Sequence, residues 1–236
     1  MSARVPDKEG EAELDFLDQL ARTTGRRQFL QWSGLTMAVI ALGCSDDDNT
    51  GPDGSDTVNL GSGDTGVLNY AYALEQLEAA FYTAVTASFY TGATADEQAI
   101  LNDIKAHEVI HRDFLKAALG TAAIPDLTVD FTSVDLTSRE QVLGAAKTFE
   151  DLGVAAYNGA GKLLTTPANL VNAGRIVSVE ARHAAAIRDL VAANSFAGSD
   201  VVDANGLDRA FTPTQVLTAA DPYITTTINA SGLPTT

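Results

Sequence analysis

The chain contains the stretch Val177-Ser178-Val179-Glu180-Ala181-Arg182-His183-Ala184-Ala185-Ala186-Ile187-Arg188, which has the pattern of a helix throughout. Residues three apart on a helix share one face, so Glu180 and His183 can bind one metal ion from the same side. A second copy of the pattern, with Glu108 and His111, lies in Ala106-His107-Glu108-Val109-Ile110-His111-Arg112-Asp113-Phe114-Leu115. Two Glu-x-x-His helices in one small α-helical protein predict a two-metal carboxylate site inside a four-helix bundle.

A matching helix precedes each Glu-x-x-His motif. Leu74-Glu75-Gln76-Leu77-Glu78-Ala79-Ala80-Phe81-Tyr82 aligns without gaps on Phe149-Glu150-Asp151-Leu152-Gly153-Val154-Ala155-Ala156-Tyr157. The alignment pairs Glu75 with Glu150 and Tyr82 with Tyr157, and it sets Glu78 opposite Gly153. The two halves of the domain therefore resemble each other.

The residue types in this duplicated pattern suit a particular chemistry. Iron and manganese favour carboxylate oxygen, and imidazole suits iron. Two ions held by four glutamates and two histidines would have enough ligands if some carboxylates bridge. The negative ligands would also nearly cancel the charge of the ions, which allows the site to lie inside an apolar bundle.

Helix start and stop signals divide the domain into four helices. The expected ranges are 65–90, 94–119, 137–158 and 166–194, and capping boxes at Thr94–Glu97 and Thr137–Glu140 open the second and third. The long connection 121–136 lies between two short ones, which favours an all-α, ferritin-like antiparallel bundle with one crossover between helices 2 and 3. Residues 196–236 should form an irregular C-terminal extension that wraps the bundle, with one or two helical turns at Thr212–Thr218.

Whole-chain composition narrows the function classes. The 236 residues are 45% hydrophobic and 19% charged, as expected of a globular protein with a core. A net charge of −16 argues against nucleic-acid binding, because phosphate contacts need lysine and arginine. The single cysteine, Cys44, excludes an intramolecular disulfide framework and a cysteine-rich metal site.

The N-terminal region has the pattern of an export signal. Thr24-Gly25-Arg26-Arg27-Gln28-Phe29-Leu30 resembles a twin-arginine motif, and the apolar run that follows is too short to span a bilayer. Ala41-Leu42-Gly43-Cys44 resembles a lipobox, which predicts lipidation of Cys44 and membrane attachment of an exported, periplasmic or cell-envelope lipoprotein. The alternative is a buried N-terminal helix with a chance arginine pair. The expected organisation is an export signal (1–43), a polar flexible tether (44–64), the bundle (65–195) and the C-terminal wrap (196–236).

The quoted motifs resemble the ferritin-like superfamily, in particular the bacterial and plant group related to desiccation-associated proteins, over about residues 65–220. The resemblance implies a metal-ligand set of Glu75, Glu108, His111, Glu150, Glu180 and His183. Position 75 precedes 108 by 33 residues, whereas 150 precedes 180 by 30. Glu78, which lies 30 residues before Glu108, therefore stays open as an alternative or extra ligand.

Three further residues lie close to this set. Tyr82 and Tyr157 follow their glutamates by two helical turns and are interpreted as hydrogen-bonded core tyrosines. His107, one turn before His111, is interpreted as a histidine outside the ligand set, either supporting the ligands or lying at the surface.

The leading functional hypothesis is an exported protein with two iron ions that reacts with dioxygen or peroxide, as an oxidase, ferroxidase or peroxide scavenger. One alternative is a non-catalytic bundle with a structural or stress-protective role in the envelope, and another is a manganese protein with catalase-like activity. The sequence leaves open whether the protein is an enzyme, which metal it binds, and whether it forms homo-oligomers.

Overall fold

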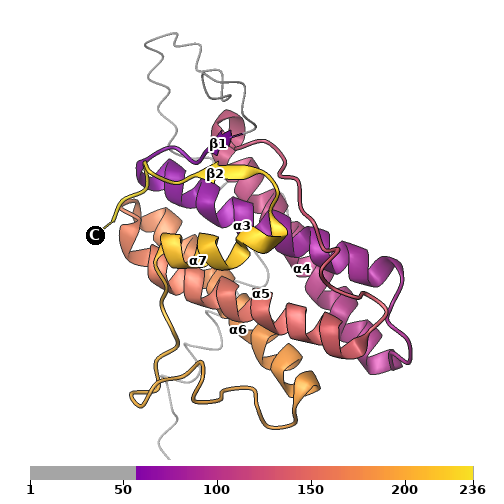
Figure 1. Cartoon of the computed structure of the whole chain (residues 1–236). Helices are drawn as coiled ribbons and strands as arrows, with labels where there is room; N and C mark the ends of the chain where they lie inside the picture. The colour runs from indigo at the N-terminus through magenta and orange to yellow at the C-terminus, as the bar shows by residue number, and fades with distance from the viewer. Residues whose placement is uncertain (1–56, 236) are drawn as a thin grey trace, which may run out of the picture. The chain divides into compact units, whose positions relative to one another are not determined.

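The computed structural model describes residues 57–235, and four long helices form the body of this part of the chain (Figure 1). Each helix packs mainly against its neighbour in sequence, so that the first two form one pair and the last two form the other. These helices are α3 (Gly63–Ala87), α4 (Ala95–Leu119), α5 (Arg139–Ala160) and α6 (Pro167–Val191). The predicted all-α bundle, with its long connection between the second and third helices, is confirmed.

The helix starts follow local capping chemistry. Thr94 and Glu97 form the predicted capping box at the start of α4. The box predicted for the next helix is wrong, because the N-cap of α5 is Ser138 and not Thr137. The Ser138 hydroxyl accepts a hydrogen bond from the backbone N–H of Gln141, and Thr137 instead bonds to Asp135.

Three of the helix ends differ from the predicted ones by two or three residues. Helix α3 ends at Ala87, because Ser88 is extended and the chain then turns the ring of Tyr90 into the core. Helix α6 ends at Val191, and Asn194, with a φ of 66°, adopts a left-handed conformation that does not continue a helix. Helix α5 continues past Gly159 to Ala160, two residues beyond the predicted end.

The segment after the bundle is more regular than the sequence suggested. It contains α7 (Pro213–Ala220), which packs on α5, and β2 (Thr227–Asn229). Strand β2 pairs in parallel with β1 (Thr57–Asn59), and short 3-10 turns η1, η2 and η3 cover Gly120–Ala122, Gly161–Leu163 and Asp221–Tyr223. Strand β1 and the first two residues of α3 fall within the range 44–64 that was assigned to a tether.

The predicted export signal and Cys44 lie outside the described residues. Within residues 57–235, no helix combines the length and apolar character needed to cross a membrane.

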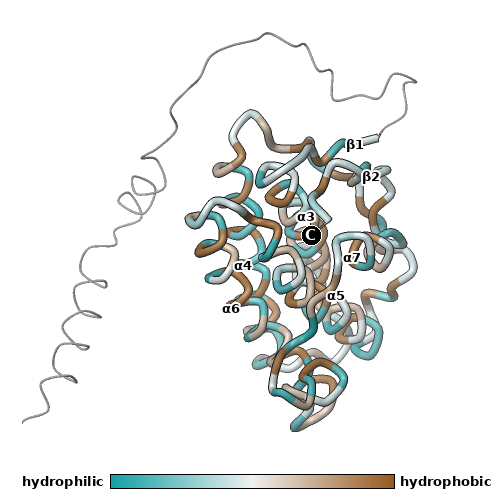
Figure 2. The backbone as a smooth tube through the Cα atoms, turned by 90° about the vertical axis from the view of Figure 1, so that its left-hand side faces the viewer, coloured by the Kyte–Doolittle hydropathy of each residue, from teal (hydrophilic) through white to brown (hydrophobic). Residues whose placement is uncertain are grey.

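The bundle core follows from helical periodicity. Apolar and polar residues alternate along the helices (Figure 2), which turns one stripe of each helix inward. Each of the four helices contributes fully buried side chains to this core, such as Leu77, Leu101, Leu143 and Ile187. Six buried polar residues interrupt these inward stripes near the middle of the bundle, namely Glu75, Glu108, His111, Glu150, Glu180 and His183.

Candidate metal centre

The four bundle helices bring two groups of potential metal ligands together in the core. Glu75, Glu108, His111 and Glu180 form one group, and Glu108, Glu150, Glu180 and His183 form the other. Within each group, ligand atoms from all four residues lie within 4.8 Å of one another. The two groups share Glu108 and Glu180, so the cluster is a pair of sites with two common carboxylates.

The cluster has an approximate two-fold symmetry that follows the sequence duplication. His111 Nδ1 lies 2.7 Å from Glu180 Oε1 and 3.5 Å from Glu75 Oε2. In the other half, His183 Nδ1 lies 2.7 Å from Glu108 Oε1 and 3.5 Å from Glu150 Oε2. Each histidine therefore contacts the Glu-x-x-His glutamate of the opposite half more closely than its own.

Most of the converging atoms have no hydrogen-bond partner. Both oxygens of Glu108 and Glu180, one oxygen of Glu75 and of Glu150, and Nδ1 of each histidine are buried and unpaired. All four glutamates are fully buried. Leaving so many buried polar atoms unpaired is costly, so this arrangement fits a site whose atoms are satisfied by bound cations.

Two tyrosines form hydrogen bonds with the remaining oxygens of Glu75 and Glu150, which are the outer glutamates because each belongs to only one of the two groups. Tyr82 in the first half donates a 2.6 Å hydrogen bond to Glu150 Oε1, and Tyr157 in the second half donates one of 2.5 Å to Glu75 Oε1. Each tyrosine thus crosses to the glutamate of the other half. Glu75 and Glu150 keep one free oxygen each, whereas Glu108 and Glu180 keep two. The two glutamates with both oxygens free are thus the two that both groups share.

The electrostatics of the cluster show how strongly it needs positive charge. Burial opposes protonation of His111, but the carboxylates of Glu108, Glu180 and Glu75 raise its pKa to about 12. Burial, together with repulsion from Glu108 and Glu180, raises the pKa of Glu150 to about 8 even though His183 lowers it. Protonated imidazoles or metal ions could supply the charge. The grouping of donor atoms from four residues within 4.8 Å of one another is compatible with metal ions as the source of that charge.

The two halves differ at one position next to the cluster. Glu78 is buried, with 3% of its surface exposed, and belongs to neither group of ligand atoms. Its counterpart in the second half is Gly153, and a Cβ added at Gly153 would lie 3.0 Å from Glu78 Oε1. The side chain of Glu78 thus occupies space that the missing side chain of Gly153 leaves.

A third histidine connects one ligand to the surface. His107 is exposed, and its Nδ1 lies 2.9 Å from Nε2 of His183, with the two rings stacked. If Nδ1 of His183 binds a cation through its lone pair, Nε2 carries the proton and donates it in a hydrogen bond to Nδ1 of His107. Val179 takes the position equivalent to His107 in the second half.

The structure therefore brings together all six residues of the ligand set implied by resemblance. Of the two alternatives left open in the first helix, Glu75 lies in the donor group and Glu78 lies beside it. Tyr82 and Tyr157 are hydrogen-bonded core residues, as interpreted from the sequence, and His107 contacts a ligand from outside the set. The crossed tyrosine bonds were missed, because a sequence alignment pairs equivalent residues but does not show which half they contact.

Comparisons with known proteins agree with this geometry. A family model described as a ferritin-like domain matches residues 63–193, which is more than half of the chain and includes all six residues of the cluster. A search of curated proteins found no match. The match and the buried carboxylate–histidine cluster together show that the chain belongs to the ferritin-like domain family.

Proposed function

We propose that this protein holds two iron ions in the carboxylate–histidine cluster and uses them in a reaction with dioxygen or peroxide. The observation that carries the proposal is the set of unpaired, buried ligand atoms that four helices aim at one another. Four carboxylates would balance the charge of two divalent ions, which removes the main cost of burying either partner alone. Carboxylate and imidazole donors together suit iron.

The proposed roles follow from the free atoms of each residue. Glu75 and His111 would bind one ion, and Glu150 and His183 the other. Glu108 and Glu180, which belong to both groups and have both oxygens free, would help to hold both ions. Bound iron would supply the one-electron redox chemistry that protein side chains lack.

The rest of the chain would position these ligands. Tyr82 and Tyr157 restrict the outer glutamates to one free oxygen each, because the other oxygen accepts a hydrogen bond. His107 fixes the tautomer of His183 in the orientation that leaves Nδ1 free. The low exposure of the cluster excludes bulk water, which strengthens the electrostatic interactions in the site.

Metal analysis of the full chain tests this proposal. The expected result is about two iron atoms per chain in protein purified from iron-replete cells. Glu108→Ala and Glu180→Ala should each lose nearly all of the metal, because each would remove a ligand to both ions. Glu140→Ala, an exposed residue at the start of α5, is the matched control and should keep the full metal content.

The outcomes separate the competing functions. Two manganese atoms per chain would replace the iron proposal with the catalase-like alternative. A fully folded chain with no bound transition metal after growth in iron- and manganese-supplemented medium would contradict the proposal and favour the non-catalytic bundle. Loss of metal in Glu140→Ala together with loss of helical signal would mark a folding defect instead.

We also propose that the protein is exported and anchored by lipid at Cys44, on the strength of the twin-arginine and lipobox patterns. Replacing Arg26 and Arg27 with lysine should trap the protein inside the cell. Cys44→Ser should release it from the membrane fraction without altering its metal content. Unchanged fractionation of both variants would contradict this part of the proposal.

A further inference from the structure

An apolar cavity lies between the four helices at one end of the bundle. It measures about 30 Å³, as the space open to the centre of a water-sized sphere. Its walls come from the first half of α3, the second half of α4, the end of α5 and the start of α6. Leu74, Phe114, Ala160 and Ile176 are among the lining residues, and the few polar ones include Tyr70 and Asn172.

The cavity adjoins the Glu75 half of the cluster. Tyr157 lines it and donates the hydrogen bond to Glu75, and Leu74 is the chain neighbour of Glu75. Leu115, one turn beyond His111, also lines it, as does Ile176, one turn before Glu180. The lining residues thus lie within one residue or one helical turn of Glu75, His111 and Glu180. The cavity is therefore next to the group that contains these three residues.

The duplication explains why the cavity exists at this end. Helix α5 aligns on α3 with an offset of 75 residues, and α6 aligns on α4 with an offset of 72. Three alanines line the cavity at positions whose counterparts at the opposite end are larger, fully buried residues. These pairs are Ala156 with Phe81, Ala160 with Val85, and Ala173 with Leu101.

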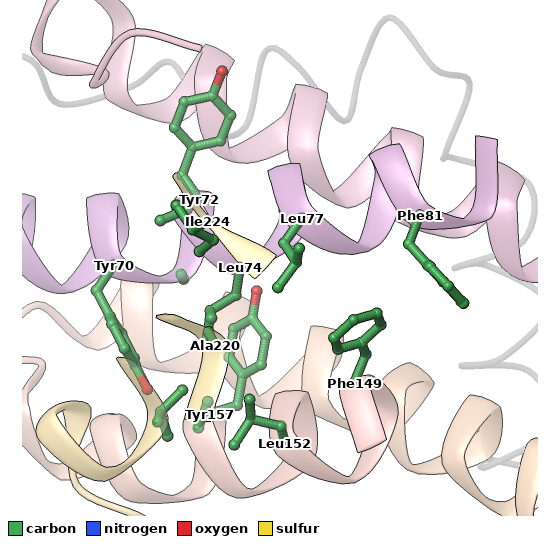
Figure 3. Packing of buried hydrophobic residues seen from close by; sticks show 14 of the residues in the cluster. Tyr70, Tyr72, Leu74, Leu77, Phe81, Phe149, Leu152, Tyr157, Ala220 and Ile224 are labelled. Atoms are coloured by element: carbon green, nitrogen blue, oxygen red, sulfur yellow. The ribbon is translucent and has the colours of Figure 1, made fainter. Parts of the chain in front are cut away.

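The close view of the core shows residues from both regions (Figure 3). At one end lie Phe81 on α3 and Phe149 on α5, and their ring centroids are 4.9 Å apart in an edge-to-face contact. At the other end, Tyr70 extends from α3 and Tyr157 from α5, with Leu74 near them. The exchange is not uniform, because Phe114 and Tyr70 at the cavity are larger than their counterparts, Ala186 and Ala145.

The size and lining of the cavity define what it can hold. About 10–15 Å³ of such space is needed for one water molecule, so 30 Å³ has room for about two small atoms. Apolar cavities of this kind stay dry and take up xenon or other apolar molecules. We infer that this cavity is a binding site for a small, uncharged apolar gas of the size of dioxygen, held beside the Glu75–His111 position. The link to dioxygen use rests on the proposed function, whereas the gas site itself does not.

Xenon is the probe that tests the gas site. Crystals of the full chain under xenon pressure should show one xenon atom among Leu74, Phe114, Ala160 and Ile176, with or without metal in the cluster. Ala160→Val, which introduces the residue found at the opposite end, should lower xenon occupancy at least tenfold. Ala117→Val, an exposed position on α4, is the matched control for adding a β-branched residue to a helix and should leave occupancy unchanged.

Absence of xenon from the wild-type cavity, or equal occupancy in folded Ala160→Val, would overturn the inference. If Ala160→Val does not fold, Ala173→Leu offers a second way to fill the space from the half-buried side of α6. In protein that loads iron, the rate of iron oxidation should fall in Ala160→Val at low dioxygen concentration and recover at high concentration. Failure to load metal would refute the proposed function and leave the xenon result standing.

Discussion

The two halves of the bundle show how one duplicated sequence pattern can give two different environments. Their central residues are nearly equivalent, since each half supplies an outer glutamate, a Glu-x-x-His pair and a tyrosine that crosses to the other half. The surroundings differ. The Glu150 half ends in an aromatic cluster, and the Glu75 half ends in a cavity.

Two polar differences accompany the packing difference. Glu78 lies beside the cluster opposite Gly153, and His107 supports His183 while Val179 takes its place in the other half. The residues of the cluster are thus arranged symmetrically. The space beside the cluster and the hydrogen bonding of its histidines differ between the two halves. The two proposed metal positions should therefore differ in affinity and in exposure to small molecules, even though their ligand types are the same.

The largest difference in the free energy of unfolding should come from truncating a core side chain at each end of the bundle. Phe149→Ala should lower the free energy of unfolding by about 3–5 kcal/mol, because it leaves a hole among closely packed rings. Phe149 packs edge-to-face on Phe81 and on Tyr223. Its counterpart Leu74→Ala should cost less, about 2–3 kcal/mol, because Leu74 already borders open space and has fewer contacts to lose. Urea unfolding of both variants at the same metal load measures the difference, and equal costs would contradict the packing contrast.

The next contrast concerns support of the histidines. His107→Ala should weaken metal binding at the His183 position by about 10–100-fold and leave the His111 position unchanged, because only His183 loses its hydrogen-bond partner. Stepwise titration against a competing chelator would resolve the two affinities. Val179→Ala is the matched control and should change neither. The amide oxygen of His107→Gln can accept the same bond, so a partial recovery of metal affinity would show that His107 acts by positioning His183. No recovery, with an equal loss of affinity at both positions, would contradict this role.

A smaller effect is expected where Glu78 faces Gly153. In a Glu78→Ala background, Gly153→Ala should stabilise the protein by about 1 kcal/mol, since glycine is a poor helix former and the new methyl meets no carboxylate. In the wild-type background the gain should shrink or vanish, because the methyl would lie 3.0 Å from Glu78 Oε1. The double-mutant cycle, measured by urea unfolding, gives the coupling between the two positions. Additive effects would show that the two side chains do not share this space.

The smallest contrast lies at the helix starts. Asp64 in the first turn of α3 accepts hydrogen bonds from the backbone N–H groups of Thr165 and Thr166 and from the side chain of Asn169. In the other half, Arg139 is aligned with Asp64 and Glu97 is aligned with Asn169, and these two residues form a 2.7 Å ion pair. The same contact between helix starts is therefore made with different chemistry.

Burial opposes ionisation of Asp64, but these hydrogen bonds hold its pKa well below the usual value of 3.8. A lowered pKa stabilises the fold above about pH 3.8, and this contribution is lost as the pH falls through the folded-state pKa. Asp64→Ala should therefore cost about 1 kcal/mol at pH 7 and progressively less below pH 3.8. Unfolding measured across pH 2–7 tests this, with Asp208→Ala as an exposed control; a cost that does not vary with pH would exclude the charged hydrogen bonds as its source.

The sequence by itself determined the fold class and the two Glu-x-x-His pairs of the cluster. Helical periodicity, the Thr94–Glu97 capping box and Pro167 depend on neighbours along the chain, so they are readable without tertiary structure. The motif spacing likewise places Glu108 with His111 and Glu180 with His183 on one helix face each. The less accurate helix ends, such as that of α3, depend on where Tyr90 finds space in the core.

Only the tertiary structure decided which residues meet across the bundle. The choice of Glu75 over Glu78 as a cluster member depends on how far α3 is rotated against its neighbours, and sequence spacing left both open. The crossing of Tyr82 to Glu150 and of Tyr157 to Glu75 depends on the antiparallel packing of α3 against α5. The cavity is likewise a property of four helix ends together, since small residues leave a space only where no neighbour moves in to fill it.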